Sequence, residues 1–349
     1  MKKKRFPKVL GSIYLVLLAA LTFTAVRTPE AAPAPSPAPM EKVQNYIKFG
    51  VGTSGPPNII GGAFCAVVSK HSDIKASTQY SGGLPSFPLL ATGDIDMISY
   101  GGPLFMSGYL GQGVKATKIR LLSSAGAPSL AINVICTRPD TGIKTIAGLR
   151  GKKVSAEQPS IPNFAIVMDA LLKHNGMTRN DLVWLKSSAS QESVDGLIEK
   201  RLDAAIKVLG AKTMEIQEAV GIYYIPLNPG EQEAVCKAIA MQAYTVPKGV
   251  FGVEVDTPTV AEIFGIITRL EMNDITAYTA TKALYEHIGD FHKVNELCKG
   301  FKLENAMNQM LLPMHPGAIR YYKEKGVWTA AHEAKQQTLL AKEKEIFKD

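Results

Sequence analysis

The amino-acid sequence predicts an α/β protein with two lobes, each a mostly parallel sheet flanked by helices, joined by crossing strands at a hinge. Segments typical of strands and helices alternate from residue 46 to residue 136, and again from the turn at 138–142 to residue 226. The pattern then leaves this second unit, so the middle of the chain reads as an insertion into a discontinuous first domain. We therefore expect a ligand cleft between the lobes. The expected boundaries are 46–137 with 246–349 for lobe 1, and 138–245 for lobe 2.

The expected strands are short runs rich in apolar residues, and most are separated by segments with helical spacing of small and apolar residues. In lobe 1 we expect strands at 46–52, 74–80, 94–100, 119–124 and 130–136, with helices at 58–71, 85–91 and ending near Gly111. In lobe 2 we expect strands at 149–155, 181–185, 202–209 and 222–226, with helices at 163–175, 190–200 and 213–220. Beyond residue 258 the pattern predicts helices at 260–269, 274–287 and 291–299, followed by a solvated helix at 330–349.

The N-terminus predicts export. Four basic residues, KKKR, precede the apolar run Val9–Val26, which is the pattern of a signal segment at 1–26. A Pro/Ala-rich linker follows at 27–45 and predicts a stiff spacer. The run could be a cleaved signal peptide or an uncleaved membrane tether. The protein is expected in the periplasm, either free or anchored to the inner membrane.

Composition and charge exclude several classes of function. The formal net charge of +8 is concentrated in residues 1–40, where six basic side chains face one acid, so the rest carries +3. This balance argues against nucleic-acid binding. The four cysteines form no C-x-x-C pair, their disulfide state stays open, and the six histidines form no ligand set. No nucleophile or acid/base pair has motif context, so we expect no catalytic residue. We also expect no metal and no cofactor, and a monomer.

The glycine loop after the first strand is the leading candidate for ligand binding. Gly50, Gly52 and Gly55 spell the dinucleotide pattern G-x-G-x-x-G, but Pro56-Pro57 delay the helix, and the next strand ends without the acid that would hold a ribose. The loop still presents backbone N–H groups, the Thr53 and Ser54 hydroxyls and a helix N-terminus, which suit a carboxylate. A tight turn without a ligand is the alternative.

Other candidates follow neighbouring strands, whose carboxyl ends meet at one edge of an open α/β sheet. Glycine loops follow the second and third strands, and the loop from Glu157 corresponds to them in lobe 2. Lys207 interrupts an apolar strand. It would supply the countercharge for an anionic ligand, with Lys212 as the other candidate for that role, or it snorkels at an edge or pairs with an acid. Tyr100 and Phe251 would be walls of the cleft or ordinary core. The predicted binding residues are Thr53, Ser54, Asn58, Gly82, Gly83, Tyr100, Gln158, Ser160, Asn163, Lys207 and Phe251.

Four sequence blocks, in order, resemble the TAXI family, the substrate-binding subunits of one branch of TRAP transporters. The blocks are FGVGTSGPPNIIGGAF, YSGGLPSFPLLATGDIDMISYGGP, TIAGLRGKKVSAEQPSIPNFAIVMDALLKHNGM and MHPGAIRYYKEKGVW, and the resemblance covers about residues 46–328. It implies a type II periplasmic binding-protein fold that closes on a small organic anion. Such ligands are amino acids such as glutamate, dicarboxylates or oxoacids, delivered to a TRAP permease in the membrane. A membrane-tethered ligand sensor is the alternative function, and an enzyme is the least expected.

Overall fold

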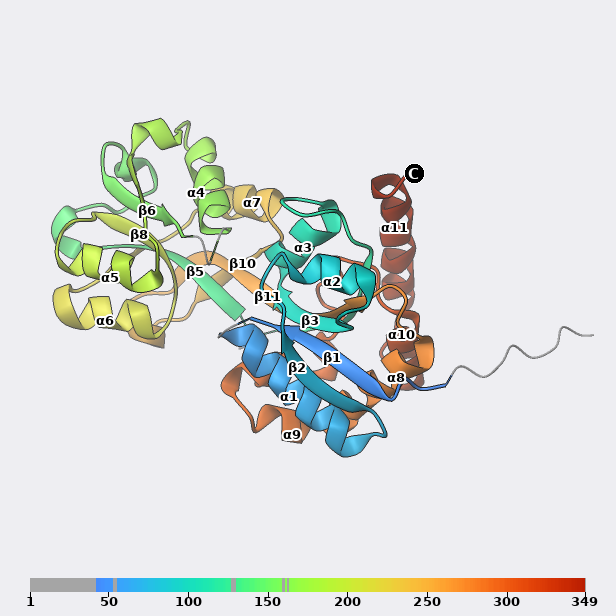
Figure 1. The fold of residues 1–349 in the computed structure, drawn as a ribbon. Coiled ribbons are helices and arrows are strands. Elements are labelled where there is room, and N and C mark those ends of the chain that lie inside the picture. Colours follow the sequence, from blue (N-terminus) through green and yellow to red (C-terminus); the bar gives the residue numbers. More distant parts are fainter. Residues whose placement is uncertain (1–41, 53–54, 127–129, 159–160, 162, 349) are drawn as a thin grey trace, which may run out of the picture. The chain divides into compact units, whose positions relative to one another are not determined.

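The computed structural model describes residues 42–348, except 53–54, 127–129, 159–160 and 162. The predicted signal segment and most of the predicted linker lie outside the described residues, as do Thr53, Ser54 and Ser160. Glu41–Asp349 form one compact unit (Figure 1). Among the described helices, none combines the length and the apolar character needed to cross a membrane.

The first sheet has the strand order β2-β1-β3-β11-β4. Its strands are β1 (Tyr46–Val51), β2 (Lys75–Tyr80), β3 (Met97–Gly101), β4 (Ile119–Ser124) and the second half of β11 (Thr257–Arg269). Strand β1 is parallel to β2 and β3, whereas β11 is antiparallel to β3 and β4. The inserted strand therefore makes this sheet mixed.

The second sheet repeats the same order as β7-β6-β8-β5-β9. Its strands are β5 (Leu130–Thr137), β6 (Lys153–Glu157), β7 (Val183–Lys186), β8 (Ala204–Val208) and β9 (Tyr223–Ile225), and β10 (Gln242–Val246) pairs with the first half of β11. The fourth position holds β11 in the first sheet and β5 in the second, and these two strands also pair with each other. This 2-1-3-n-4 order is that of type II periplasmic binding proteins, so the predicted fold class is confirmed.

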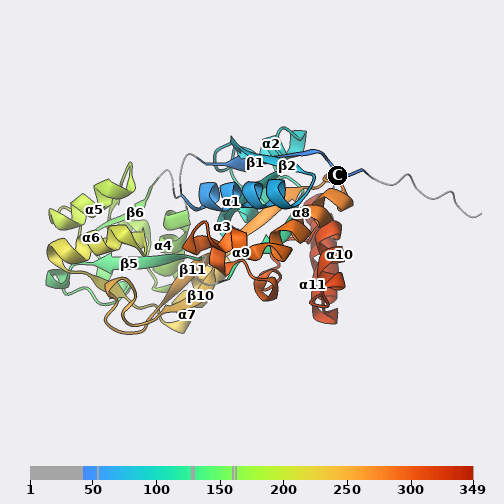
Figure 2. The same cartoon turned by 90° about the horizontal axis from the view of Figure 1, so that it is seen from below.

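Helices cover both sheets. The first sheet packs in one core with α1 (Pro56–His71), α2 (Ser86–Thr92), α3 (Gly102–Leu110), α8 (Asp274–Glu286), α9 (Ile288–His292), α10 (Pro316–Glu324) and α11 (Ala330–Ile346). Helix α1 lies beside α8 and α9 (Figure 2). On the second sheet, α4 (Asn163–His174) and α7 (Pro229–Ala238) share one core, and α5 (Ser190–Ile198) and α6 (Ala211–Val220) share another. Short 3₁₀ turns lie at Pro139–Thr141, Ala147–Leu149, Arg179–Asp181, Val250–Gly252, Glu296–Gly300 and Leu303–Asn305.

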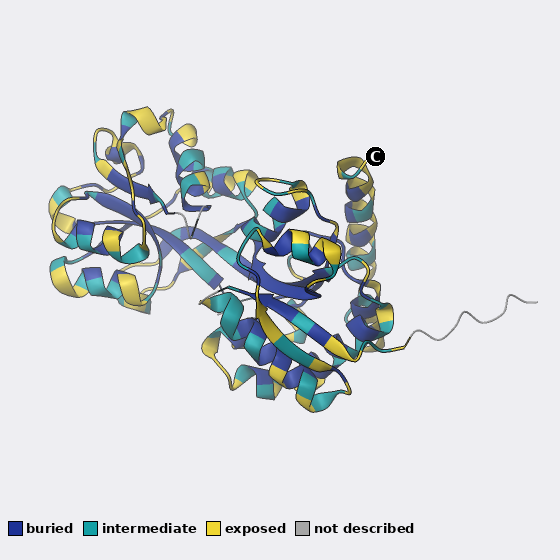
Figure 3. Cartoon of the chain, in the orientation of Figure 1, coloured by how far each residue is buried: buried dark blue, intermediate teal, exposed yellow. Residues whose placement is uncertain are grey.

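The helix predicted at 260–269 is wrong, because these residues form most of the long strand β11. The strand joins both sheets, pairing with β10 and β5 through its first half and with β3 and β4 through its second half. Both of its faces are therefore largely buried (Figure 3). A strand buried on both faces is continuously apolar and lacks the alternation that distinguishes strands from helices. The helix predicted at 291–299 is likewise replaced by the end of α9 and a 3₁₀ turn.

The C-terminal helix α11 is anchored to the first sheet, whereas the sequence predicts a solvated helix there. The Arg120 guanidinium donates two hydrogen bonds to the Glu343 carboxylate, at 2.6 and 2.7 Å, and both side chains are buried. Gln336 exchanges two hydrogen bonds with the backbone of Met314, at 2.8 and 3.0 Å. The sequence does not reveal this anchoring face, since two of its three buried residues, Gln336 and Glu343, are polar and only Leu339 is apolar.

Candidate ligand site

The carboxyl ends of β1, β2 and β3 meet at one edge of the first sheet, as the sequence predicts. The N–H groups of Ser81 and Gly82 donate to the carbonyl of Val51, at 3.0 and 3.4 Å. From β3, the buried Tyr100 hydroxyl donates to the Gly82 carbonyl at 2.6 Å. Burial raises the pKa of this tyrosine, so it is a neutral donor. Two of the predicted site residues, Gly82 and Tyr100, are therefore in direct contact.

Helix α1 begins at this edge and presents a bare N-terminus. Gly55 occupies the N-cap with φ at 85°, the helix has no side-chain cap hydrogen bond within the described residues, and its first turn holds no acid. Asn58, in that first turn, has a buried Oδ1 with no hydrogen-bond partner among the described residues. A 16-residue helix with uncapped N–H groups suits an anion at its start. Thr53 and Ser54, which the sequence assigns to the same ligand, lie outside the described residues.

Glu262 of β11 lies where the two sheets exchange strands. It pairs in register with Ala131 of β5, and two residues further on Phe264 pairs with Gly101 at the end of β3. The Glu262 carboxylate packs against Gly101, because a methyl group at that glycine would lie 2.1 Å from Oε2. Glu262 thus links the carboxyl end of β3 in the first sheet to strands of the second sheet.

Two amide side chains face Glu262 from the second sheet. Asn163, the first residue of α4 and a predicted site residue, donates from Nδ2 to Glu262 Oε1. Asn133 of β5 is fully buried and also hydrogen-bonds the carboxyl. Burial raises the pKa of Glu262 to about 7, and the hydrogen bonds from Asn163 and Asn133 only partly oppose that rise. No described lysine, arginine or histidine forms an ion pair with this carboxyl.

Lys207 lies elsewhere, in the core between the second sheet and helices α5 and α6. The lysine is 1% exposed, and its Nζ donates to the Ser190 carbonyl, the Ser190 hydroxyl and the Ser193 hydroxyl at 2.7–2.8 Å. Burial lowers its pKa to about 8. These three bonds use all three N–H donors of an ammonium. The described residues therefore leave Lys207 no free donor, and they do not bring it together with the other predicted site residues.

The remaining predicted residues are scattered. Gly83 lies in ordinary contact distance of Leu104, and Gln158 is buried at the end of β6. Phe251 is 47% exposed and has φ at +46°, beside the core of α6. Its carbonyl accepts a hydrogen bond from Tyr224 at 3.1 Å. These contacts assign no ligand to any of the three, and their binding roles stay predictions.

Glu157, at the end of β6, joins an ionic network on the edge of the second sheet. It accepts from Lys186 at 2.7 Å and from the Trp184 indole at 3.1 Å, and these hydrogen bonds lower its pKa. Arg179 lies 3.6 Å away and stacks on the Trp184 ring at 4.3 Å. The carboxylate is therefore already matched by cations.

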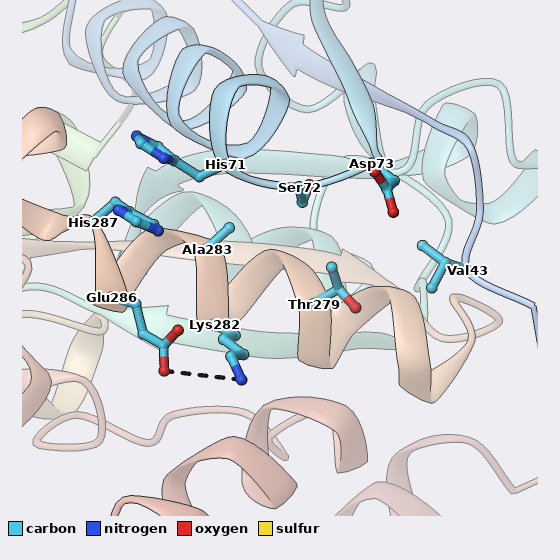
Figure 4. Close-up of a pocket in the computed structure, with 9 residues that line it drawn as sticks. All are labelled: Val43, His71, Ser72, Asp73, Thr279, Lys282, Ala283, Glu286 and His287. Atoms are coloured by element: carbon cyan, nitrogen blue, oxygen red, sulfur yellow. Dashed lines mark ion pairs between the residues drawn. The ribbon is translucent and has the colours of Figure 1, made fainter.

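Two surface hollows lie away from these residues. One, of about 280 Å³, is lined by the end of α1 and by α8, and the His71 and His287 rings stack there at 3.6 Å (Figure 4). The C-terminal end of α1 is about 24 Å from its N-terminus, at 1.5 Å per residue. The other hollow, of about 430 Å³, is lined by the C-terminal parts of α4 and α7. Neither contains a predicted site residue.

Metal-binding and thiol chemistry find little support in the described part of the chain. It contains no group of three or more His, Cys, Asp or Glu side chains that could hold a metal ion. The four cysteines are free, and burial raises the pKa values of Cys65 and Cys136 to about 12. These thiols are protonated at neutral pH, as expected for cysteines that pack in a core.

The strand order and the meeting of carboxyl ends at an exchanged strand define a type II periplasmic binding-protein fold. A model of the NMT1-like family matches residues 51–326, so this chain belongs to the NMT1-like family.

Several solved structures are similar. The chain resembles XAC2383 from Xanthomonas citri bound to ATP, with a TM-score of 0.50 and 10% identity over 85% of this chain and 99% of that one. It also resembles the periplasmic aliphatic sulphonate binding protein SsuA from Escherichia coli, with a TM-score of 0.44 and 14% identity over 85% of both chains. An ABC uptake transporter substrate binding protein from Streptococcus pneumoniae, with bound histidine, gives a TM-score of 0.42 and 13% identity over 72% and 90%. At these identities the likeness concerns the fold alone.

Glu262 and Asn133 are absent from the residues predicted from the sequence. A signal for Glu262 is present, because a lone acid interrupts the apolar run Val260–Ile267. The same kind of signal, a charge in an apolar strand, singles out Lys207. For Glu262 this signal is missed when residues 260–269 are predicted as a helix, because an acid on a helix can point to solvent.

Proposed function

We propose that this chain is an extracytoplasmic solute-binding protein that binds a small organic solute between two lobes. The proposed lobes are residues 46–137 with 246–349, and residues 138–245. The single observation that carries the proposal is the position of Glu262. It lies on an exchanged strand, against the end of β3 in one sheet and the start of α4 in the other. In open α/β sheets, ligands bind outside the carboxyl ends of strands.

The proposed ligand carries at least one carboxylate, in the range of amino acids, dicarboxylates and oxoacids. The bare N-terminus of α1 and the adjacent Tyr100–Gly82 contact support a carboxylate-binding edge on the first sheet. The proposed membrane partner is a TRAP-type permease, and the four sequence blocks that resemble the TAXI family support it. Export by the N-terminal signal segment, with or without anchoring to the inner membrane, completes the proposal.

The test is ligand identification on the full chain isolated from its exported fraction. Mass spectrometry of small molecules released on denaturation should identify a carboxylate-bearing solute. Thermal unfolding of the emptied protein should then show a saturable rise in Tm with that solute, because a ligand that binds only the folded state stabilises it. If no amino acid, dicarboxylate or oxoacid raises the Tm, this class of ligand is wrong.

A further inference from the structure

The acceptor groups around Glu262 outnumber the donors that face them. Asn163 donates to one carboxylate oxygen, Oε1, and the Asn133 side chain also hydrogen-bonds the carboxyl. The Asn133 Oδ1 is buried and has no hydrogen-bond partner among the described residues. Asn133 is 0% exposed, so bulk water does not reach this oxygen. A buried acceptor without a donor is costly, and such groups in native proteins call for a specific explanation.

These acceptors share one face of the second sheet. Glu262 pairs with Ala131 and Asn133 pairs with Val260, so Glu262 and Asn133 are diagonal neighbours on adjacent strands. Side chains two residues apart on a strand point to the same side, and diagonal neighbours across strands are within reach of each other. The Asn133 amide oxygen and the Glu262 carboxyl are therefore held together by sheet geometry.

Among the described residues, the surroundings of Glu262 also provide no cation that forms an ion pair with it. Both hydrogen-bond partners of Glu262 are neutral amides, and no ion pair to it occurs within the described residues. The first turns of α3 and α4 both lie close to the Glu262 carboxyl. Gly101, which the carboxyl contacts, is the N-cap of α3, and Asn163, which donates to it, is the first residue of α4. Helix N-termini favour the charged carboxylate, which opposes the effect of burial. A carboxylate so placed has one obvious missing partner, a positively charged donor.

From this cluster we infer that Glu262 and Asn133 form the specificity-determining subsite for a positively charged nitrogen of the ligand. This inference rests on the proposed function, and it adds a second charge to the proposed carboxylate ligand. An ammonium group has three donors and a positive charge, which match the unpaired amide oxygen and the carboxylate. Asn163 is a positioning residue that orients the carboxyl through Oε1. The ligand therefore carries both a carboxylate and a positively charged nitrogen, and it resembles an amino acid more than a dicarboxylate.

The experiment compares matched probes that differ only in one charged group. The first set is L-leucine, 4-methylpentanoate and isopentylamine, and the second pair is L-glutamate and glutarate. Binding to the emptied full chain is measured by calorimetry for the wild type and for Glu262→Gln, Asn133→Ala and Glu254→Gln. Glu254 is an exposed acid that serves as the matched control. We expect an amino acid to bind at least tenfold more tightly than its deaminated acid.

Glu262→Gln should reduce that preference to less than threefold, Asn133→Ala should reduce it in the same direction, and Glu254→Gln should leave it unchanged. A preference that Glu262→Gln leaves intact would overturn the inference, and so would tighter binding of glutarate or 4-methylpentanoate than of the amino acid. Binding of isopentylamine without any carboxylate-bearing probe would support the cationic subsite but contradict the proposed carboxylate ligand. If both variants lose all binding, their unfolding curves show whether they are still folded. If the variants are folded, the subsite stands, and if they are unfolded, Glu262 and Asn133 are structural and the inference fails.

Discussion

Two strands of this molecule each carry one ionisable side chain among apolar neighbours, and the two side chains differ in how many of their hydrogen-bonding groups have partners. Lys207 of β8 is 1% exposed, and three oxygens accept its three N–H groups. Glu262 of β11 is partly buried, receives neutral amide donors and lies beside an amide oxygen with no donor. Burial favours the neutral form of both groups: it lowers the pKa of the lysine to about 8 and raises the pKa of the glutamate to about 7.

The number of hydrogen bonds that a buried charged group makes therefore distinguishes structural charges from binding charges better than its burial does. A fully satisfied buried group contributes to one defined packing and leaves nothing for a partner. A partly satisfied cluster is stable only when the rest of the fold or a ligand compensates for it. On this criterion Lys207 is a structural residue of the α5–α6 core, and Glu262 belongs to a binding site. Three experiments test this contrast between Lys207 and Glu262.

The largest expected effect is on stability, through Glu262→Gln. The folded pKa of Glu262, about 7, exceeds its ordinary value of 4.5, so the folded state binds the proton more tightly than the unfolded state. The free energy of unfolding of the ligand-free wild type should therefore fall as pH rises from 4.5 to 7. The variant lacks this titration. It should match the wild type near pH 4.5 and exceed it at pH 8 by up to about 3 kcal/mol.

Denaturant unfolding at several pH values measures this gap, and Glu254→Gln provides the control because Glu254 is exposed. A gap of the same size at pH 4.5 and pH 8 would mean that the carboxyl is not the origin of the strain. A variant that is less stable at pH 8 would show that the carboxylate is already compensated in the free protein, and the contrast with Lys207 would disappear.

The sequence predicts elements that depend on short-range patterns better than it predicts the strand that joins the two sheets. Strands β1 to β4 and helix α1 follow from short-range patterns, and the contact between Tyr100 and Gly82 follows from the rule that carboxyl ends converge. Strand β11 does not follow, since its partners β3, β4 and β5 are far away in the chain and only β10 directly precedes it. Its burial on both faces removes the alternation that marks a strand. Because Glu262 lies on β11, the error in the fold also conceals this site residue.

A smaller effect is expected from Gly101→Ala, which disturbs the position of the Glu262 carboxyl. The new methyl group would lie 2.1 Å from Oε2, so the carboxylate must shift away from it. The φ of Gly101 is −73°, which alanine adopts without strain, so the effect is one of space alone. Affinity for the amino-acid ligand should fall about tenfold, which corresponds to about 1.4 kcal/mol. Calorimetry of the folded variant measures the loss.

The control for this variant is Gly289→Ala, because a methyl group at Gly289 meets nothing within 4 Å. A double variant with Glu262→Gln sharpens the test. If Gly101 acts through the carboxyl, the two losses are not additive, as expected for residues in contact. Additive losses would show that Gly101 supports the site independently, through the backbone at the end of β3.

The smallest expected effect is that of Lys207→Met on ligand binding. The ammonium has no donor left for a ligand, so affinity for the identified solute should stay within about twofold of the wild type. The variant also tests the burial of the Lys207 amine. Because burial lowers the lysine pKa to about 8, from 10.5, the wild type should gain stability as pH rises through this interval, and the variant should not. Loss of that titration together with a tenfold loss of affinity in a folded variant would make Lys207 the ligand countercharge, as the sequence alone allows, and would remove the distinction between the two charges.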